Sequence, residues 1–519
     1  MSGLVGLWHL DGRPADQRIV ASLASVIAHR GGDHSGIWSD GPASFACQLQ
    51  RVAPQSATEC QPITDSLGHV LLFDGRLDNR EELLAAMTTR NAKALAERSS
   101  SSAKALAERD PPDSALVLAA WREWGRDFLA RLKGDFALAL FDSRAQRLLL
   151  ARDPVGCRPL YYWTDGKTIV FASEIKAIAA HPDVRTTPND DLLADFFLLD
   201  RLPYDDEGET FFRGIHAVRP GHWLRVAPHH TTSGQFWDFD PLAQVRYASY
   251  ADYTERFREL LIQAVKRRLR SAHPVAVATS GGLDSSIVLC IADDLCRSGD
   301  ADVSLLPLSY TPREKSHREE NEFIQLLEST RQLHVRRIEI GEPCNPEQLA
   351  HAAWHSESPQ FDDAWCAERP MLAAAHALGA KVLLTGLWSD QFLFVTGYLT
   401  DLVRALSWRQ VAKHLQEYPR WFVDADPAYF RARFRRDLLL GLTPNALRAW
   451  LRPFRTAVAS SRAFPFVTRA WEARVRRQRP RFGRPRFASA HARNLYQAVR
   501  AQSHRLEIER DAKLAASYA

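Results

Sequence analysis

The stretch VAVATSGGLDSSIVLCIADDL, residues 275–295, joins an apolar strand directly to a helix through the loop SGGLDSS. Gly281 and Gly282 carry no side chains, so main-chain N–H groups in this loop can approach a phosphate closely. The positive N-terminal end of the following helix would point at the same anion. Three serines add hydroxyl donors: Ser280, Ser285 and Ser286. The stretch predicts a nucleotide phosphate site, and a glycine turn with Asp284 as helix N-cap is the alternative.

A second element of the predicted site lies in KVLLTGLWSDQFLF, residues 381–394. Ligands of open α/β sheets lie beyond the carboxyl ends of the strands, so a later parallel strand should contribute residues beside the loop. Asp390 would share a magnesium ion with Asp284, or would instead cap a helix. The complete predicted set is Ser280, Gly281, Gly282, Leu283, Asp284, Ser285, Ser286, Leu308, Thr385 and Gly386 for ATP and pyrophosphate, with Asp284 and Asp390 for the metal.

The whole chain divides into two halves with different patterns. Residues 1–235 contain short β-type runs separated by turns, such as HVLLFDGRLDN at 69–79, and indicate stacked antiparallel sheets. Residues 236–252 form a polar linker, and from Tyr253 apolar residues recur at helical intervals. In 253–519, β-type runs alternate with helical stretches. The predicted fold is therefore α+β followed by a doubly wound parallel-sheet α/β domain with C-terminal helices.

Length and composition agree with a two-domain globular protein. The chain has 519 residues, whereas single cores stop growing near ~250–300 residues. No apolar run approaches the roughly 18–20 residues of a spanning helix, and no charged stretch followed by an apolar one opens the chain. We therefore expect a cytoplasmic protein that does not contact membranes. The seven cysteines form no paired CxxC spacing, which favours reduced, buried thiols over a zinc knuckle or disulfide framework.

Arginines crowd the segment from Arg448 to Arg486, in which Glu472 is the only acidic residue. This segment could receive an acidic leader peptide or a partner protein, or it could be a solvated surface. No recognised binding module surrounds the arginines, so a nucleic acid partner is not expected.

Several motifs of the first half resemble those of the asparagine synthetase superfamily. MSGLVG is similar to that family's MCGIxG, HRGGDHSG to RGPDxxG, FDGRLDNREEL to FNGEIYNxxEL, and RDPVGCRPLYY to RDPLGxxPLYY. In the second half, SGGLDSS resembles the pyrophosphate-binding loop of N-type ATP pyrophosphatases, and GAKVLLTGLWSDQ resembles the family's GxKVxLSGEGxDE. The resemblance covers nearly the whole chain. It implies a glutaminase-like αββα sandwich of the N-terminal nucleophile type, joined to an ATP pyrophosphatase domain that uses ATP and Mg²⁺.

The departures from this family concern the glutaminase site. Active members have cysteine after the initiator methionine, whereas this chain has Ser2. The Asn and Glu of the family's NGE stretch correspond to Asp74 and Arg76. An acid in place of the amide donor would repel the oxyanion it should stabilise, so we predict no glutaminase activity. The degenerate site comprises Ser2, Arg51, Asp74, Gly75, Arg76 and Asp113, of which Arg51 and Asp113 match the family.

Without ammonia, the attacking amine must come from the substrate. The resemblance extends to two branches that lack the nucleophile, namely β-lactam-forming synthetases and lasso peptide cyclases. GETFFRGIHAVRPGHWLRV, residues 208–226, is similar to a segment of the cyclases. The cyclase resemblance implies a precursor peptide substrate, a leader-peptide-binding protein and a leader peptidase as partners. The alternatives are an asparagine synthetase or β-lactam synthetase-like small-molecule ligase, and an inactive homologue.

Three further features bear on catalysis. Leu387 stands where asparagine synthetases have the Glu of SGEG, which acts on the amine, and leucine cannot take a proton. His351, His355 and Glu357 are weak candidates for catalytic groups, with an exposed helix face as the alternative. The family's final stretch carries an essential lysine for which we identify no counterpart before Ala519, so we expect a truncated reading frame or a substitute. The candidate substitutes are Arg481, Arg484 and Arg486.

Overall fold

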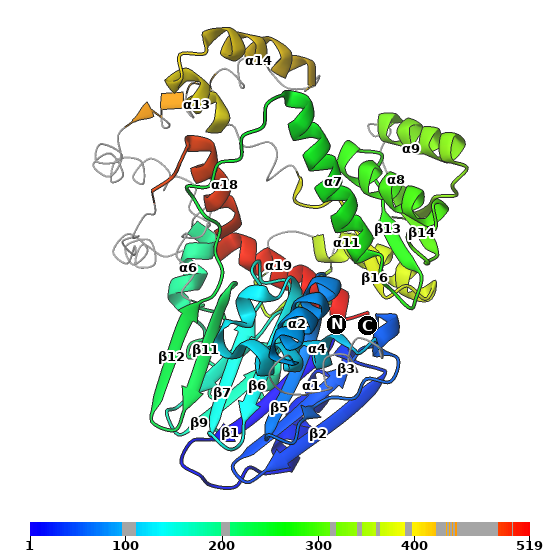
Figure 1. Ribbon diagram of the computed structural model, residues 1–519. Coiled ribbons are helices and arrows are strands. Elements are labelled where there is room, and N and C mark those ends of the chain that lie inside the picture. Colours follow the sequence, from blue (N-terminus) through cyan, green and yellow to red (C-terminus); the bar gives the residue numbers. More distant parts are fainter. Residues whose placement is uncertain are drawn as a thin grey trace.

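The fold is described from a computed structural model. It covers residues 1–95, 110–198, 208–311, 318–339, 345–359, 364–389, 397–421, 486–500 and 502–518, with 432, 435, 438, 439, 442 and 443. Two layered sheets form the N-terminal domain, a smaller parallel sheet forms the centre of the C-terminal domain, and a late helix lies between them (Figure 1). Asp390 and nearly all of the basic segment from Arg448 to Arg486 fall outside the described residues.

The N-terminal domain contains two antiparallel six-stranded sheets. The first has the order β10 (Ile215–Ala217), β8 (Tyr161–Thr164), β9 (Thr168–Ala172), β1 (Gly3–His9), β3 (Ala43–Leu49) and β2 (His34–Asp40). The second has the order β12 (His230–Gln235), β11 (His222–Ala227), β7 (Arg147–Arg152), β6 (Gly134–Asp142), β5 (His69–Leu77) and β4 (Ile63–Thr64).

Both faces of each central strand are buried, which explains why these runs are almost continuously apolar. In β1, Leu4 and Trp8 face the second sheet, where Trp8 meets Phe141 edge-on at 5.2 Å between ring centroids. The alternate residues Val5 and Leu7 pack against helices instead. Helices α1 (Gln17–Val26) and α5 (Ile175–Ala179) cover the first sheet, and α2 (Arg80–Leu95) and α4 (Asp113–Trp124) cover the second. The predicted αββα sandwich is confirmed.

The C-terminal domain opens with helix α7 (Tyr250–Arg268), three residues earlier than its apolar pattern predicted. The early start has a local cause, because Ser249 and Asp252 form a reciprocal capping box. Its sheet has the order β15 (Arg336–Glu339), β14 (Leu305–Thr311), β13 (Val275–Ala278) and β16 (Val382–Leu384), with every pair parallel.

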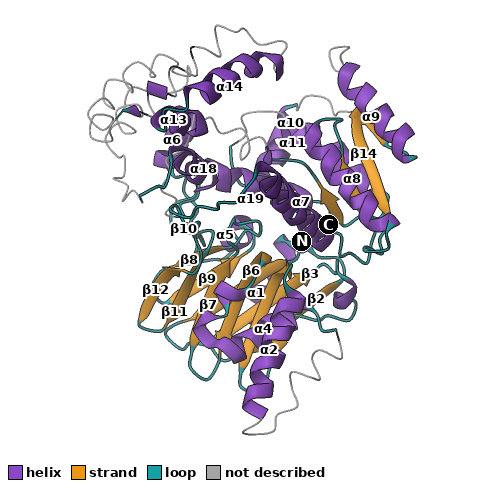
Figure 2. Ribbon diagram, turned by 45° about the horizontal axis from the view of Figure 1, so that its top comes forward, coloured by secondary structure: helices purple, strands orange, loops and turns teal. Residues whose placement is uncertain are grey.

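Helices cover both faces of this sheet, as predicted for a doubly wound domain (Figure 2). Residues of α7 and α8 pack on one face, and Met371 and Ala375 of α11 pack on the other. The remaining long helices of the described chain are α6 (Asp190–Leu198), α8 (Leu283–Arg297), α9 (Arg318–Arg331), α10 (Pro346–Ser356), α11 (Ala364–Ala377), α13 (Gly397–Arg404), α14 (Trp408–Trp421), α18 (Ala490–Arg500) and α19 (Gln502–Ala516).

Helix α19 connects the two domains through buried charges. Glu509 accepts from Arg152 of β7 at 2.7 Å and from the Tyr161 hydroxyl at 2.8 Å. Lys513 lies 2.7 Å from Glu357, which follows α10. Burial alone would raise the pKa of Glu509, but the charges of the neighbouring arginines outweigh it and lower the pKa to about 2. The helix therefore holds both domains around the space between them.

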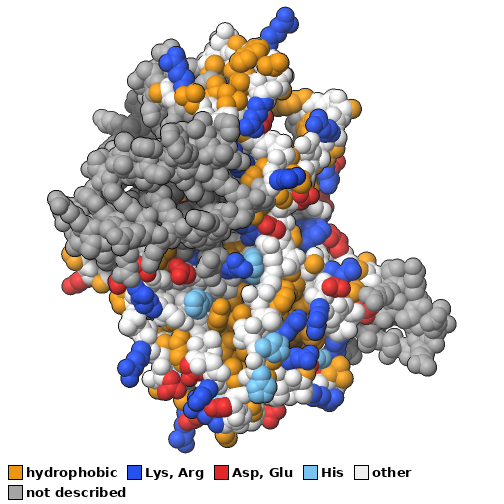
Figure 3. Space-filling view, turned by 90° about the vertical axis from the view of Figure 1, so that its left-hand side faces the viewer, with side chains coloured by type: hydrophobic (Ala, Val, Ile, Leu, Met, Phe, Trp, Pro, Cys, Tyr) orange, Lys and Arg blue, Asp and Glu red, His pale blue; other side chains and the backbone are white. Residues whose placement is uncertain are grey.

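Two surface features complete the description. Among the described residues, no helix is long and apolar enough to cross a membrane. On the face in Figure 3, basic and acidic side chains of the described part are interspersed.

Five cysteines within the described part of the chain are free. Cys47 is buried, as predicted. Cys60 is exposed, contrary to the prediction, because it follows a turn outside the sheets.

Candidate active site

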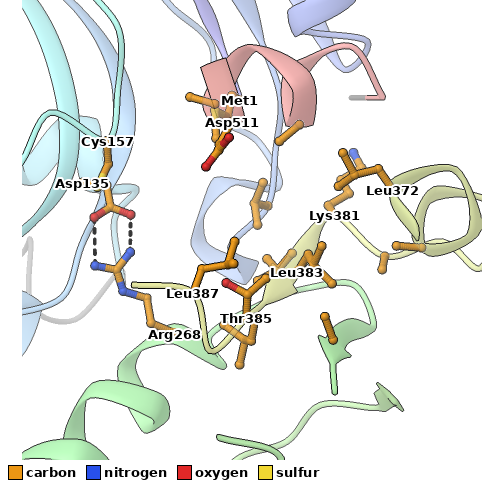
Figure 4. A pocket seen from close by; sticks show the side chains of 18 of the residues that line it. Met1, Asp135, Cys157, Arg268, Leu372, Lys381, Leu383, Thr385, Leu387 and Asp511 are labelled. Atoms are coloured by element: carbon orange, nitrogen blue, oxygen red, sulfur yellow. Dashed lines mark hydrogen bonds and ion pairs between the residues drawn. The ribbon is translucent and has the colours of Figure 1, made fainter. Parts of the chain in front are cut away.

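A cavity of about 1730 Å³ lies between the two domains and α19. Its "Ser2 end" is lined by residues around Ser2 and Asp74 of the N-terminal domain, and its "nucleotide end" by the loops that follow β13 and β16. Figure 4 shows Lys381, Leu383, Thr385 and Leu387 along β16 and its loop, and Asp511 of α19 on the other side. Residues that the sequence suggested for two separate sites thus line one space.

At the nucleotide end, the serines of SGGLDSS shape the loop. Ser285 Oγ accepts from the Ser280 N–H at 3.1 Å and donates to the Gly282 carbonyl at 3.2 Å. Gly281 has φ +85°, which a side chain would strain. The N-cap of α8 is Gly282, so the alternative role of Asp284 as N-cap is wrong, and Asp284 lies in the first helical turn. The loop thus presents the helix N-terminus to the cavity.

Two buried hydroxyls near this loop have no hydrogen-bond partner within the described part of the chain. They are Oγ of Ser286 and Oγ1 of Thr279. A buried polar atom without a partner carries a free-energy cost of about 1–3 kcal/mol, so these hydroxyls are candidates to bond a ligand. The loop at the nucleotide end therefore has hydroxyl groups that no described residue uses.

The loop after β16 lies directly against this helix N-terminus. A Cβ added at Gly386 would lie 2.7 Å from the Ser285 nitrogen, so only glycine fits there. Strands β13 and β16 are neighbours, whereas β14 follows β13 on the opposite side. The two loops therefore meet at the point where the strand order reverses, the usual ligand position in such sheets. Of the predicted set, the cavity is lined by Ser280, Gly282, Leu283, Asp284, Ser285, Thr385 and Gly386. Gly281 and Ser286 belong to the same loop but are not among the cavity residues.

Leu308 does not reach the cavity, contrary to its predicted role. Its side chain is 1% exposed in the core, and its carbonyl accepts from the Thr279 N–H at 2.8 Å. Leu308 therefore supports the loop from behind. Asp390, the second predicted magnesium ligand, lies outside the described residues, as do Arg481 and Arg484.

The β16 loop continues with Leu387, which the sequence comparison marked as replacing a family Glu, and with Trp388, for which no role was predicted. Leu387 is 61% exposed and lines the cavity. Trp388 has φ +72°, a strained conformation for a bulky residue, and its ring meets that of His504 edge-on at 4.3 Å. Burial lowers the pKa of His504 to about 4, so its imidazole is neutral at pH 7. Helix α19 thus braces this loop.

At the Ser2 end, the Ser2 hydroxyl is already engaged. Its Oγ accepts from the Gln50 N–H at 3.1 Å, and the Ser2 N–H donates to Asp74 Oδ1 at 2.9 Å. A carboxylate at this position would repel a developing oxyanion. Arg30, which is fully buried, donates to the Ser2 carbonyl at 3.2 Å.

The other positions of the degenerate site take part in contacts with the end of α7. Arg76 donates to the carbonyls of Arg267 at 2.5 Å and Arg268 at 3.4 Å, and burial lowers its pKa to about 10. Asp113 accepts from Arg270 at 2.6 Å and also pairs with Arg80. These groups bind neighbouring parts of the chain in place of a small ligand.

Arg51 and Gly75, two more positions of the degenerate site, also have structural roles. Arg51 donates twice to the Glu59 carbonyl, at 2.7 and 3.1 Å. Gly75 lines the cavity and lies so close to β6 that an added Cβ would be 2.4 Å from the Asp135 carbonyl. Arg51 therefore forms hydrogen bonds within the protein, and the missing side chain of Gly75 allows β5 and β6 to pair.

Arg268 makes the main contact of α7 with the N-terminal domain. Its guanidinium forms two bonds with Asp135, one of 2.9 Å, and pairs with Asp78 at 2.8 Å (Figure 4). Burial alone would raise the pKa of Asp135, but the charge and hydrogen bonds of Arg268 lower it to about 2. This contact seals one wall of the cavity.

His351, His355 and Glu357, the weak catalytic candidates, are not among the cavity residues. Glu357 accepts from the N–H groups of Ile175 and Lys176 at 2.9 and 2.6 Å, which caps α5 of the other domain. His355 is buried, its Nε2 lies 3.2 Å from that of His351, and burial lowers its pKa to about 3. His351 is exposed, as the alternative supposed, whereas His355 is buried and contacts His29 of the other domain. Glu357 and His355 therefore hold the two domains together.

Two family models match the chain in sequence. Residues 1–237 match the glutamine amidotransferase domain, and residues 256–509 match asparagine synthase. Among curated relatives, amidase chry2 of Gibberella zeae is 29% identical over 401 residues, covering 73% of this chain and 55% of the relative. Asparagine synthetase [glutamine-hydrolyzing] 2 of Bacillus subtilis is 26% identical over 477 residues, covering 88% and 58%.

A solved structure of glutamine phosphoribosylpyrophosphate amidotransferase from B. subtilis, complexed with ADP and GMP, covers 74% of this chain and 90% of its own. Its TM-score is 0.32 and its sequence identity 14%. The chain spans about half the length of the curated relatives it matches.

Proposed function

This chain belongs to the asparagine synthetase superfamily, combining a glutamine amidotransferase domain with an asparagine synthase domain, and on that premise we propose that it is an ATP-dependent carbon–nitrogen ligase. It would join a carboxylate to an amine and release AMP and pyrophosphate. The observation that carries this proposal is the meeting of SGGLDSS with the Gly386 loop at the reversal of strand order, with unpartnered hydroxyls beside it.

The nucleotide end has the features that ATP requires. The main-chain N–H of Gly282 and the hydroxyl of Thr279, both in the cavity lining, would hold the pyrophosphate, helped by the positive end of α8. The substrate carboxylate would attack the α-phosphorus and expel pyrophosphate. Helix α19 and both loops line the cavity, so bound substrate would cover the acyl adenylate and limit its contact with water.

Magnesium is expected from the family, and the described residues test this only in part. Asp284 supplies one carboxylate in the first turn of α8. The described residues contain no cluster of three possible metal-ligating side chains. A magnesium ion there would have to take its other ligands from ATP phosphates and water, as Mg²⁺ commonly does, and would offset the phosphate charge.

We propose further that the amine belongs to the substrate, as in lasso peptide cyclases. The groups that would bind glutamine are engaged in contacts with α7 and Glu59, and Asp74 opposes an oxyanion. The cavity, at about 1730 Å³, exceeds the ~300–1000 Å³ of common small-ligand pockets. A precursor peptide would fit this space, and holding its amine beside its activated side-chain carboxylate would replace ammonia.

An asparagine synthetase or another small-molecule amide ligase is the second candidate. It is supported by the relatives, which include asparagine synthetases and an amidase. A leader-peptide-binding protein and a leader peptidase are partners only under the cyclase proposal.

Exchange of labelled pyrophosphate into ATP tests these proposals. Exchange that requires a peptide with an acidic side chain supports the cyclase, and exchange that requires free aspartate supports the small-molecule ligase. Exchange with neither class, in protein that unfolds cooperatively, would contradict both and leave the inactive homologue. The assay contains neither glutamine nor ammonia, so it reads adenylation alone.

A further inference from the structure

Arg158, between β7 and β8, has a guanidinium that no described residue fully engages. Its side chain lines the Ser2 end of the cavity and is 15% exposed. Within the described chain its one ion pair is a loose one, 4.0 Å from Nη1 to Asp74 Oδ1, and its Nε is buried without a hydrogen bond. A buried guanidinium donor left in this state is costly unless something else accepts from it.

Neighbouring arginines on the same wall differ in this respect. Arg76, Arg268 and Arg270 also line the cavity, and each donates to carbonyl or carboxylate oxygens at 3.1 Å or less. The sequence provided acceptors for these three side chains. Nε of Arg76 is also buried without a hydrogen bond, but of these four arginines only Arg158 has no described acceptor for any guanidinium N–H.

The ion pairs around Arg158 also contain an excess of positive charge. Starting from Arg158, the pairs run through Asp74 to Arg30, then to Glu174, Lys176, Glu357 and Lys513. This connected set holds four Lys or Arg side chains and three carboxylates, and His29 also lies 3.0 Å from Glu174. Asp135 lies near Arg158 as well, but its hydrogen bonds are with Arg268. Since Arg30 already faces Asp74 at 3.8 Å, the charge of Arg158 is available to one more anion.

We propose that the Ser2 end of the cavity is a carboxylate-binding subsite in which Arg158 is the principal ligand. A planar guanidinium binds a carboxylate through two parallel hydrogen bonds, and one carboxylate would bring the set to neutrality. The carboxylate would belong to the ligase substrate, as an acidic group remote from the one that is activated at the nucleotide end. In this last point the inference rests on the proposed function.

The subsite is tested first without ATP, so that its outcome is independent of catalysis. Binding of glutarate to the full chain is followed by saturation-transfer NMR at constant ionic strength. Glutarate should bind saturably, and glutaramide, its uncharged analogue, should not. Arg158→Gln should raise the glutarate Kd at least tenfold, and Arg158→Lys about threefold, because lysine keeps the charge but loses the fork.

Matched variants separate this effect from general charge and from misfolding. Asp74→Asn keeps the shape, removes the nearest repelling carboxylate, and should lower the Kd. Arg225→Gln removes a cation of the same domain that stacks on Trp223 away from the cavity, and should leave the Kd unchanged. If Arg158→Gln does not fold, the proposal is tested by the other two variants, because Arg158→Lys should raise the glutarate Kd and Asp74→Asn should lower it.

Unchanged glutarate affinity in folded Arg158→Gln would overturn the proposal. Inorganic phosphate that displaces glutarate with equal or greater affinity would overturn the carboxylate assignment, because it would show a general anion site. In exchange assays, Arg158→Gln should raise the substrate KM and leave kcat within threefold. Absence of exchange alongside Arg158-dependent glutarate binding would contradict the proposed function and leave the subsite standing.

Discussion

The two ends of the cavity use polar residues in opposite ways. At the Ser2 end, Asp113, Arg76 and Arg51 bond to other parts of the chain, and Arg158 is the exception. At the nucleotide end, Ser286 and Thr279 keep buried hydroxyls without described partners, on a loop that is already shaped. A group whose bonding capacity is filled within the protein stabilises structure, whereas a positioned group with capacity to spare can bind a ligand. Family motifs alone do not distinguish these two conditions.

The largest expected effect comes from filling the contact between the two nucleotide-end loops. Gly386→Val should raise the Kd of ATP at least about 100-fold, because the side chain would force the loop away from the Ser285 nitrogen. Isothermal titration calorimetry measures this Kd. Gly32→Val is the control, since nothing lies within 4 Å of a Cβ there. Near-normal ATP affinity in Gly386→Val would show that this end is not preorganised.

A structural role for the Ser2 end predicts a stability effect. Arg268→Met should lower the free energy of unfolding by about 3 kcal/mol, because Asp135 and Asp78 would lose a largely buried partner. Urea unfolding measures it. Arg256→Met on the same helix removes an exposed pair with Glu259 and should leave the free energy of unfolding nearly unchanged. Equal costs for the two variants would contradict the assigned role of the α7 contact.

Acid should weaken the junction made by α19. The folded pKa of Glu509 is about 2, below its usual 4.5, so its stabilisation is present above pH 4.5 and is lost as pH falls towards 2. We expect this group to account for on the order of 2 kcal/mol of that loss. Glu509→Gln should be less stable at pH 7 and show a shallower decline between pH 4.5 and 2. Parallel pH profiles for both proteins would refute the assignment.

The smallest expected effect concerns glutamine. The chain should hydrolyse it at the background rate, and Ser2→Ala should leave that rate unchanged, because the hydroxyl is already bonded and Asp74 opposes the oxyanion. Ammonia release in a coupled assay measures it. Glutamine hydrolysis above background that disappears in Ser2→Ala would restore a catalytic Ser2 end and remove the contrast between the two ends.

The sequence predicted the sheets, the order of the domains and the nucleotide loop because these depend on local patterns. The apolar run of β1 and the glycines of SGGLDSS act within a few residues. The roles of Arg158 and Glu357 depend on partners far away in sequence, such as the bonds of Glu357 to Ile175 and Lys176, more than 180 residues apart. Leu308 was misassigned because a strand-end residue near a ligand loop can face the core as easily as the cavity.

Helix α19 also affects how the protein folds during its synthesis. Arg152 is completely buried in the N-terminal domain, and its partner Glu509 lies 357 residues later in the chain. A growing chain therefore completes its first two sheets long before the ribosome has made the carboxylate that neutralises this guanidinium. Contacts of such long separation form slowly, so α19 should join last. Until it does, Arg152 has only the carbonyls of Val218 and Gly156 as acceptors among the described residues and lacks its carboxylate partner.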